Sequence, residues 1–227
     1  LPGGLLIQNE YLVLGCLLLW MVGLTNAYNF MDGCDGIAGG QALMAGLGWV
    51  MLTLCFPINT EVMIYGAVIA GTATGFLCYN WQPSKLFLGD VGSAFLGFTF
   101  AWMPLLAADI AEDIALTLGA GALLLWPFIM DASFTFGRRL LRGENVFKAH
   151  RSHLYQRLVL SGWSHARVSL LYMGLAITGW PLAWVWSTGH AWVIVLCPSV
   201  VLVLFLALCL LVRAVENKTT QIPKSVQ

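Results

Sequence analysis

The chain has 227 residues, of which 59% are hydrophobic and 10% are charged, and its net charge at pH 7 is zero. A soluble domain carries about 25% charged residues, so this composition excludes a water-soluble protein and indicates that lipid surrounds most of the chain. The six cysteines lack the spacing of a zinc site or a disulfide framework, and the balanced charge gives no indication of a nucleic-acid partner.

Seven apolar segments are each long enough to cross a bilayer as a helix, which takes about 20 residues. They cover residues 10–30, 37–57, 62–80, 92–109, 113–131, 167–187 and 191–212. We therefore predict an all-α fold, a polytopic transmembrane helical bundle that forms one domain over residues 1–227. One longer connection, 132–166, is polar and basic, and we expect it to be a cytoplasmic loop.

The positions of Lys and Arg predict the orientation of these spans. If the first span runs inward, all eleven Lys and Arg residues fall in the cytoplasmic connections or at their border. The opposite side then receives acidic residues, including Glu61 and Asp113. Cytoplasmic loops of membrane proteins carry an excess of basic residues, so this orientation is the one we expect.

The first polar segment, residues 26–36, follows the first predicted span. It carries an Asn or Asp at every third position, namely Asn26, Asn29, Asp32 and Asp35, with glycines that permit tight turns. One such residue would be enough to cap a helix. Four of them at a membrane surface are costly unless they are paired or used, so we favour a functional site.

The second polar segment, residues 79–93, lies between the third and fourth predicted spans. Its carboxylate, Asp90, stands just before an apolar helix, where it could simply cap the backbone. Next to Asp32 and Asp35 in a bundle, it would instead complete a cluster of oxygen ligands. Such a cluster suits Mg²⁺, which takes one or two carboxylates and leaves room for phosphate oxygens.

The third polar segment, residues 137–157, is rich in Arg and His. Contact with anionic lipid headgroups could explain much of its arginine. His150 and His153 beside Arg151 are less easily explained in this way, because imidazole and guanidinium groups are good ligands for a diphosphate. Asp131 precedes this segment, and we expect it to pair with one of the arginines.

Together the three polar segments resemble the motifs of the polyprenyl-phosphate N-acetylhexosamine-1-phosphate transferases. NAYNFMDGCDGIAGG is similar to the family's Asn-x-x-Asn-x-x-Asp-Gly-x-Asp-Gly motif, and FLGDVGSAFLG is similar to its Phe-x-Gly-Asp-x-Gly-Ser motif. HRSHLYQRL is similar to its histidine-rich loop. The order of the motifs and their expected cytoplasmic side also match, and the resemblance covers most of the chain.

The resemblance implies an enzyme of the bacterial inner membrane whose active-site loops face the cytoplasm. It would transfer a sugar 1-phosphate from a UDP-N-acetylhexosamine to undecaprenyl phosphate, with Mg²⁺ as cofactor. The products would be UMP and an undecaprenyl-diphospho-sugar that initiates a cell-surface glycan such as O-antigen. Membrane lipid is the other expected partner, and a homodimer is left open.

Residue by residue, the resemblance implies catalytic carboxylates at Asp32, Asp35 and Asp90, with Asp90 as the Mg²⁺ ligand. Phe87 is the candidate to stack on uracil. The expected substrate-binding residues are Asn29, Asn80, Phe87, Arg151 and His153.

Two departures from the family pattern affect these expectations. The family carries an Asp-Asp pair ahead of these motifs, and this chain, which begins at Leu1, contains no such pair. We therefore expect a C-terminal part of a longer transferase with about eleven spans, inactive by itself. Second, Tyr155 and Gln156 stand where many members have two further histidines, which weakens any assignment of the sugar.

Two other classes of function compete with an enzyme. A truncated remnant or a membrane-embedded, non-catalytic fragment would share the motifs without the activity. A transporter would place ionisable residues near the bilayer midplane. The carboxylates of this chain lie at the ends of predicted spans instead, which disfavours transport.

Overall fold

A computed structural model of the chain describes residues 10–111, 113–146, 148 and 150–221. Within these residues the regular structure is helical and no strand occurs, which confirms the predicted all-α fold. The helices are α1 (Glu10–Phe30), α2 (Ile37–Cys55), α3 (Thr60–Asn80), α4 (Gly89–Ala111), α5 (Ile114–Leu124), α6 (Trp126–Leu141), α7 (Leu154–Leu160), α8 (His165–Trp186) and α9 (Val193–Gln221).

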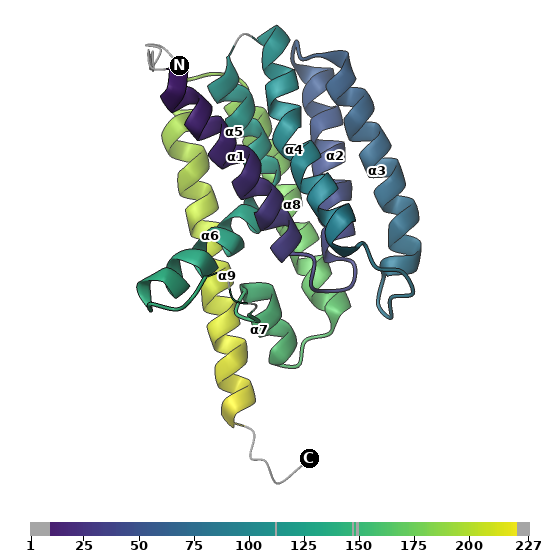
Figure 1. The fold of residues 1–227 in the computed structure, drawn as a ribbon, viewed down its shortest axis with the longest axis vertical. Helices are drawn as coiled ribbons and strands as arrows, with labels where there is room; N and C mark the ends of the chain where they lie inside the picture. The colour runs from purple at the N-terminus through teal and green to yellow at the C-terminus, as the bar shows by residue number, and fades with distance from the viewer. Residues whose placement is uncertain (1–9, 112, 147, 149, 222–227) are drawn as a thin grey trace.

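Among the described residues, six helices are each long and apolar enough to cross a membrane: α1, α2, α3, α4, α8 and α9. Figure 1 shows them gathered in one bundle. This confirms the predicted polytopic bundle. The predicted boundaries of these spans agree with the helices to within a few residues, except that α9 continues to Gln221.

The predicted fifth span, 113–131, is wrong as a single helix. α5 ends at Leu124, α6 begins at Trp126, and the two helices are bent by 84°. The 11 residues of α5 rise about 16 Å, roughly half the thickness of a bilayer's hydrocarbon core. The predicted loop 132–166 is also wrong in part, because α6 continues into it and α7 lies within it.

Pro127, in the first turn of α6, explains the break. Proline has no N–H, and its ring clashes with the carbonyl four residues earlier, which here belongs to Leu123. The carbonyl of Leu124 accepts a hydrogen bond from the Gln41 side chain at 3.0 Å. Gly179 on α8 lies so close to the Leu123 oxygen that an added Cβ would collide with it. Two neighbouring helices, α2 and α8, therefore pack closely against the bend.

α2 is the central helix of the bundle and packs against α3, α5 and α8. Its backbone comes very close to that of α3, where a Cβ added to Gly46 would lie 2.6 Å from the carbonyl oxygen of Gly66. Small residues at such positions let helices in membranes pack backbone against backbone. This packing fixes the helix ends from which the first and second polar segments extend.

The arrangement of helix ends allows a test of the orientation. The connections α1–α2 and α3–α4 lie at the same end of the bundle as α7 (Figure 1). In intact cells, we expect single cysteines at Ser152 and Asn217 to be shielded from an impermeant thiol reagent and cysteines at Thr60 and Thr188 to react. The exposed native cysteines must be replaced first; these include Cys16, Cys55 and Cys78.

Labelling after the membrane is permeabilised is the control for this experiment. It separates a cysteine on the inner side of the membrane from one that the protein itself covers. Reaction at Ser152 and Asn217 from outside, with protection at Thr60 and Thr188, would reverse the orientation.

Candidate functional site

Hydrogen bonds join the first polar segment to the second. The backbone N–H of Gly36 donates to Asn80 Oδ1 at 2.9 Å, and Asn80 Nδ2 donates to the carbonyl of Leu86 at 2.7 Å. The Ser93 hydroxyl donates to Asn29 Oδ1. Two of the predicted substrate-binding residues, Asn29 and Asn80, therefore also hold the two segments together.

The buried side chain of Asn80 uses both its donor and its acceptor, which predicts a large effect for an isosteric change. Asn80→Asp keeps the shape but sets a carboxylate oxygen against the carbonyl of Leu86. We expect a loss of about 2 kcal/mol in the free energy of unfolding, since the carbonyl of Leu86 loses its donor and the buried side chain at position 80 becomes a carboxylate without one. SDS titration of the purified protein measures this loss.

Asn59→Asp is the matched control for this change. Asn59 caps α3 by accepting from the N–H of Glu61, and Asp is as good an N-cap as Asn. Its expected effect is therefore within about 0.5 kcal/mol. Equal stability of Asn80→Asp and Asn59→Asp would contradict the bridging role of Asn80.

The carboxylates of Asp32 and Asp90 come together from the first and second segments. Burial raises the pKa of Asp32 to about 6, and the negative charge of Asp90 adds to the shift. The hydrogen bond from Ser93, three residues after Asp90, to Asn29, three residues before Asp32, brings the parts of the two segments that carry these carboxylates together. A site that holds two like charges in this way is arranged to receive a positive charge or a hydrogen-bond donor.

Asp90 and Phe87 lie on the surface of the second segment. Asp90 is exposed and stands in the first turn of α4, and within the described residues no hydrogen bond reaches its carboxylate. The structure therefore gives no support to the capping alternative. The ring of Phe87 is 73% exposed, which leaves its face open. The predicted roles of both residues stay predictions.

Asp35 has partners on both of its carboxylate oxygens. Oδ1 accepts a hydrogen bond from the Ser84 hydroxyl at 2.9 Å, and Oδ2 lies 3.3 Å from Nδ1 of His165. The Ser169 hydroxyl donates to the backbone carbonyl of Asp35. Asp35 therefore ties the first segment to the second segment and to α8. Its catalytic role stays a prediction.

The third polar segment contacts the first. Tyr155 donates its hydroxyl hydrogen to the carbonyl of Phe30 at 3.0 Å. The rings of Phe30 and His153 lie 6.4 Å apart, centroid to centroid. At Gly33 a Cβ would collide with the Tyr155 hydroxyl, so glycine is required for this approach. All three segments thus meet at one end of the bundle.

The expected pairing of Asp131 with an arginine is wrong for the described residues. Oδ1 of Asp131 lies 3.3 Å from Nδ1 of His153 and accepts from the backbone N–H of Leu154 at 2.9 Å. The arginines have other partners, because Arg138 and Arg139 bind groups within their own segment. These groups are Ser152 O, Glu144, Asn145 O and Lys148 O.

Two further arginines of the third segment differ in their surroundings. Arg157 forms a bidentate ion pair with Glu216 of α9, with distances of 2.8 and 2.6 Å. That pair fastens α7 to α9. Arg151 is exposed, so the structure leaves its guanidinium accessible, as a diphosphate ligand would have to be. Its predicted role, like that of His153, stays a prediction.

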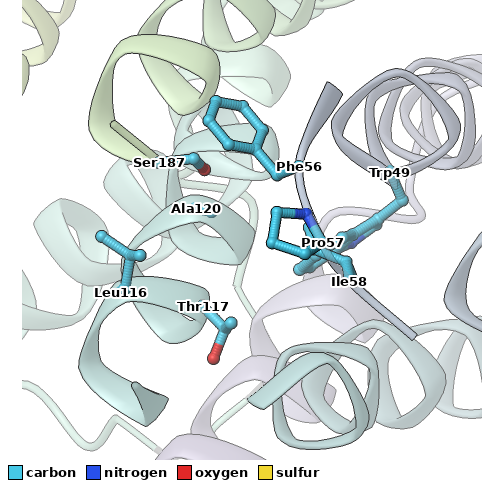
Figure 2. Close-up of a pocket in the computed structure, with 8 residues that line it drawn as sticks. All are labelled: Trp49, Phe56, Pro57, Ile58, Leu116, Thr117, Ala120 and Ser187. Carbon is cyan, nitrogen blue, oxygen red and sulfur yellow. The ribbon is translucent and has the colours of Figure 1, made fainter. Parts of the chain in front are cut away.

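A cavity of about 130 Å³ lies at the opposite end of the bundle. It is lined by the α2–α3 connection, the start of α5 and Ser187 after α8, and Figure 2 shows its mainly apolar side chains, among them Phe56 and Leu116. The buried indole N–H of Trp49, which also lines it, has no hydrogen-bond partner among the described residues. None of the predicted site residues contributes to this cavity.

The acidic pair, Asp32 and Asp90, provides two carboxylates that could bind Mg²⁺. Within the described residues, no group of three or more His, Cys, Asp or Glu side chains is arranged to hold a metal by itself. Mg²⁺ usually takes only one or two carboxylates and completes its shell with water and substrate phosphates. Asp32 and Asp90 supply that number of carboxylates, so they fit a Mg²⁺ ion whose other ligands come from a phosphate substrate.

Comparison with known proteins agrees with the motifs. Glycosyl transferase family 4 matches residues 2–108, which include the first and second polar segments. A probable undecaprenyl-phosphate N-acetylglucosaminyl 1-phosphate transferase of Bacillus subtilis is 34% identical over 158 residues, 69% of this chain and 43% of that protein.

Two further relatives carry related names. A phospho-N-acetylmuramoyl-pentapeptide-transferase of Moorella thermoacetica is 35% identical over 170 residues, 74% of this chain and 49% of that protein. A decaprenyl-phosphate N-acetylglucosaminephosphotransferase of Mycobacterium tuberculosis is 32% identical over 178 residues, 70% of this chain and 44% of that protein.

The matched region of these three relatives is slightly less than half of their length. The family model, which matches residues 2–108, covers both the first and the second polar segment. The chain belongs to glycosyl transferase family 4, among the polyprenyl-phosphate hexosamine-1-phosphate transferases.

Proposed function

We propose that the whole protein transfers a sugar 1-phosphate from a UDP-N-acetylhexosamine to undecaprenyl phosphate. The observation that carries this proposal is the acidic pair Asp32 and Asp90, placed by three polar segments at one end of a membrane bundle. The names of the relatives support the type of reaction, since those from Bacillus subtilis and Mycobacterium tuberculosis name a polyprenyl phosphate and N-acetylglucosamine.

The reaction forms one phosphorus–oxygen bond and breaks another. An oxygen of the lipid phosphate attacks the β-phosphorus of the UDP-sugar, and the bond from that phosphorus to UMP breaks. The products are an undecaprenyl-diphospho-sugar and UMP. Both reactants are anionic, so catalysis in such transfers consists mainly of positioning and of neutralising charge.

In the proposed mechanism, residues of this chain position the substrates and help to neutralise their charge. Bound Mg²⁺ would neutralise charge on the phosphates, and Asp32 and Asp90 are the residues that would hold it. The exposed ring of Phe87 stacks on the uracil, and Arg151 and His153 contact the diphosphate. Asp35 and Asn80 hold the first and second segments together, so that these groups can reach the substrates.

The membrane bundle supports the place of the reaction. A polyprenyl phosphate stays in the bilayer, so we expect its phosphate to meet the site at the membrane surface, near the helix ends that carry Asp32 and Asp90. We propose that this is the cytoplasmic face of a bacterial inner membrane and that the lipid-linked sugar initiates a cell-surface glycan such as O-antigen.

An assay in membranes tests the proposed function. Membranes that contain the whole protein are incubated with undecaprenyl phosphate and a panel of UDP-N-acetylhexosamines, and UMP and the lipid product are measured. We expect both products in equal amounts, from at least one donor, and their loss when EDTA removes divalent cations. A well-inserted protein that releases UMP from none of the donors would show a non-catalytic remnant.

A further inference from the structure

Asp131 is the most deeply buried carboxyl group next to the candidate site. It lies on α6, five residues after the helix begins, and has no exposed surface. An isolated buried carboxylate is strongly unfavourable unless it is paired and hydrogen-bonded. The contacts around Asp131 therefore have to compensate for the cost of burying its carboxyl group.

Each of these contacts is with a group that can donate. Oδ1 accepts from the backbone N–H of Leu154 at 2.9 Å and from the Thr135 hydroxyl at 3.2 Å. Oδ2 accepts from the backbone N–H of Tyr155 at 3.2 Å and from the hydroxyl of Tyr172. An ionised carboxyl group, which only accepts, is the form that fits such a set of donors.

The remaining contact of Oδ1 is with His153 Nδ1, at 3.3 Å. A carboxylate next to one ring nitrogen places a proton on it and so determines what the other can do. Among the described side chains, Asp131 is the one at hydrogen-bond distance from the ring, and it lies at Nδ1. The ring is stacked on His150 and Tyr155, with centroids 5.1 and 5.8 Å away.

We propose that Asp131 is a positioning residue that acts through His153. By holding the proton on Nδ1, it reserves Nε2 for a proton or hydrogen bond exchanged with a phosphate oxygen of the substrates. By binding the N–H groups of Leu154 and Tyr155, it also fixes where that ring stands relative to the first segment. This proposal rests on the proposed function.

A double-mutant cycle in the whole protein tests the proposal. Asp131→Asn is expected to lower kcat by about 10–100-fold, as changes behind a functional histidine do, with a smaller effect on KM. His153→Phe keeps the ring stacking and removes both nitrogens. In that background, Asp131→Asn should cause less than about a twofold further loss. Losses that multiply would show that Asp131 does not act through His153.

Tyr172→Phe is the matched control in the same assay. It removes one donor to the same carboxylate and leaves the contact with His153 in place. We expect it to lower stability but to keep kcat within about threefold of the wild type. If Tyr172→Phe lowers kcat as much as Asp131→Asn does, Asp131 has only a structural role and the proposal is overturned.

Nitrogen-15 NMR of labelled histidine in nanodiscs supplies a readout that does not depend on activity. The chain has four histidines, and His153→Phe identifies the signal of His153. We expect a proton on Nδ1 in the wild type and a shift toward the Nε2–H tautomer in Asp131→Asn. A wild-type Nε2–H tautomer would overturn this inference, whereas the expected tautomer without any sugar transfer would count only against the proposed function.

Discussion

Asp90→Asn is expected to lower the turnover of the whole protein by about 10²–10³-fold, or about 3–4 kcal/mol. The change keeps the shape of the side chain but removes a negative oxygen next to Asp32. A neutral amide is a poor ligand for Mg²⁺, so charge on the reacting phosphates would be left uncompensated. UMP release in membranes, corrected for the amount of inserted protein, measures the effect.

Glu61→Gln is the matched control, because it makes the same chemical change at an exposed carboxylate at the far end of α3. We expect it to leave turnover unchanged. If Asp90 only capped α4, Asn would replace it without loss, since Asn and Asp are equally good caps. An Asp90→Asn protein that keeps half of its turnover would therefore refute the metal-ligand assignment.

Gly179→Ala is expected to destabilise the protein by about 3 kcal/mol through overpacking. The added methyl group would collide with the carbonyl oxygen of Leu123, which belongs to the backbone and cannot move aside as a side chain can. Either α8 must move away from the break between α5 and α6, or the break must change its angle. SDS titration measures the free energy of unfolding.

Gly174→Ala, in the same helix, is the control for this change. A Cβ at Gly174 meets no atom within 4 Å, so the substitution should give no loss and could gain up to about 1 kcal/mol from helix propensity. Equal stability of the Gly179 and Gly174 variants would mean that α8 does not support the bend.

The spans were predictable from sequence because a bilayer imposes one simple requirement, a helix of about 20 apolar residues. The break in the helix at Leu125 was not predicted, although Pro127 gave a local signal for it. Counting apolar residues treats 113–131 as uniform. The break is also supported by the hydrogen bond from Gln41 and by the absence of a side chain at Gly179. Both residues lie on helices that are distant in the sequence.

The acidic residues of the candidate site could be singled out from the sequence, but the contacts that support them could not. Asp32, Asp35 and Asp90 stood out because carboxylates are rare beside apolar spans. His165 was missed, because it pairs with Asp35 across 130 positions of sequence. Asp131 was noticed, but the predicted arginine partner was wrong. The arginines follow Asp131 closely in the sequence, whereas the contact with His153 is formed only by the fold.

The bend between α5 and α6 makes the protein unequal in its two membrane leaflets. α6 turns out of the bundle (Figure 1) and exposes Phe136, Leu140 and Leu141 to its surroundings. Apolar side chains on a helix that leaves the bundle in this way would be covered by lipid on one side of the membrane only.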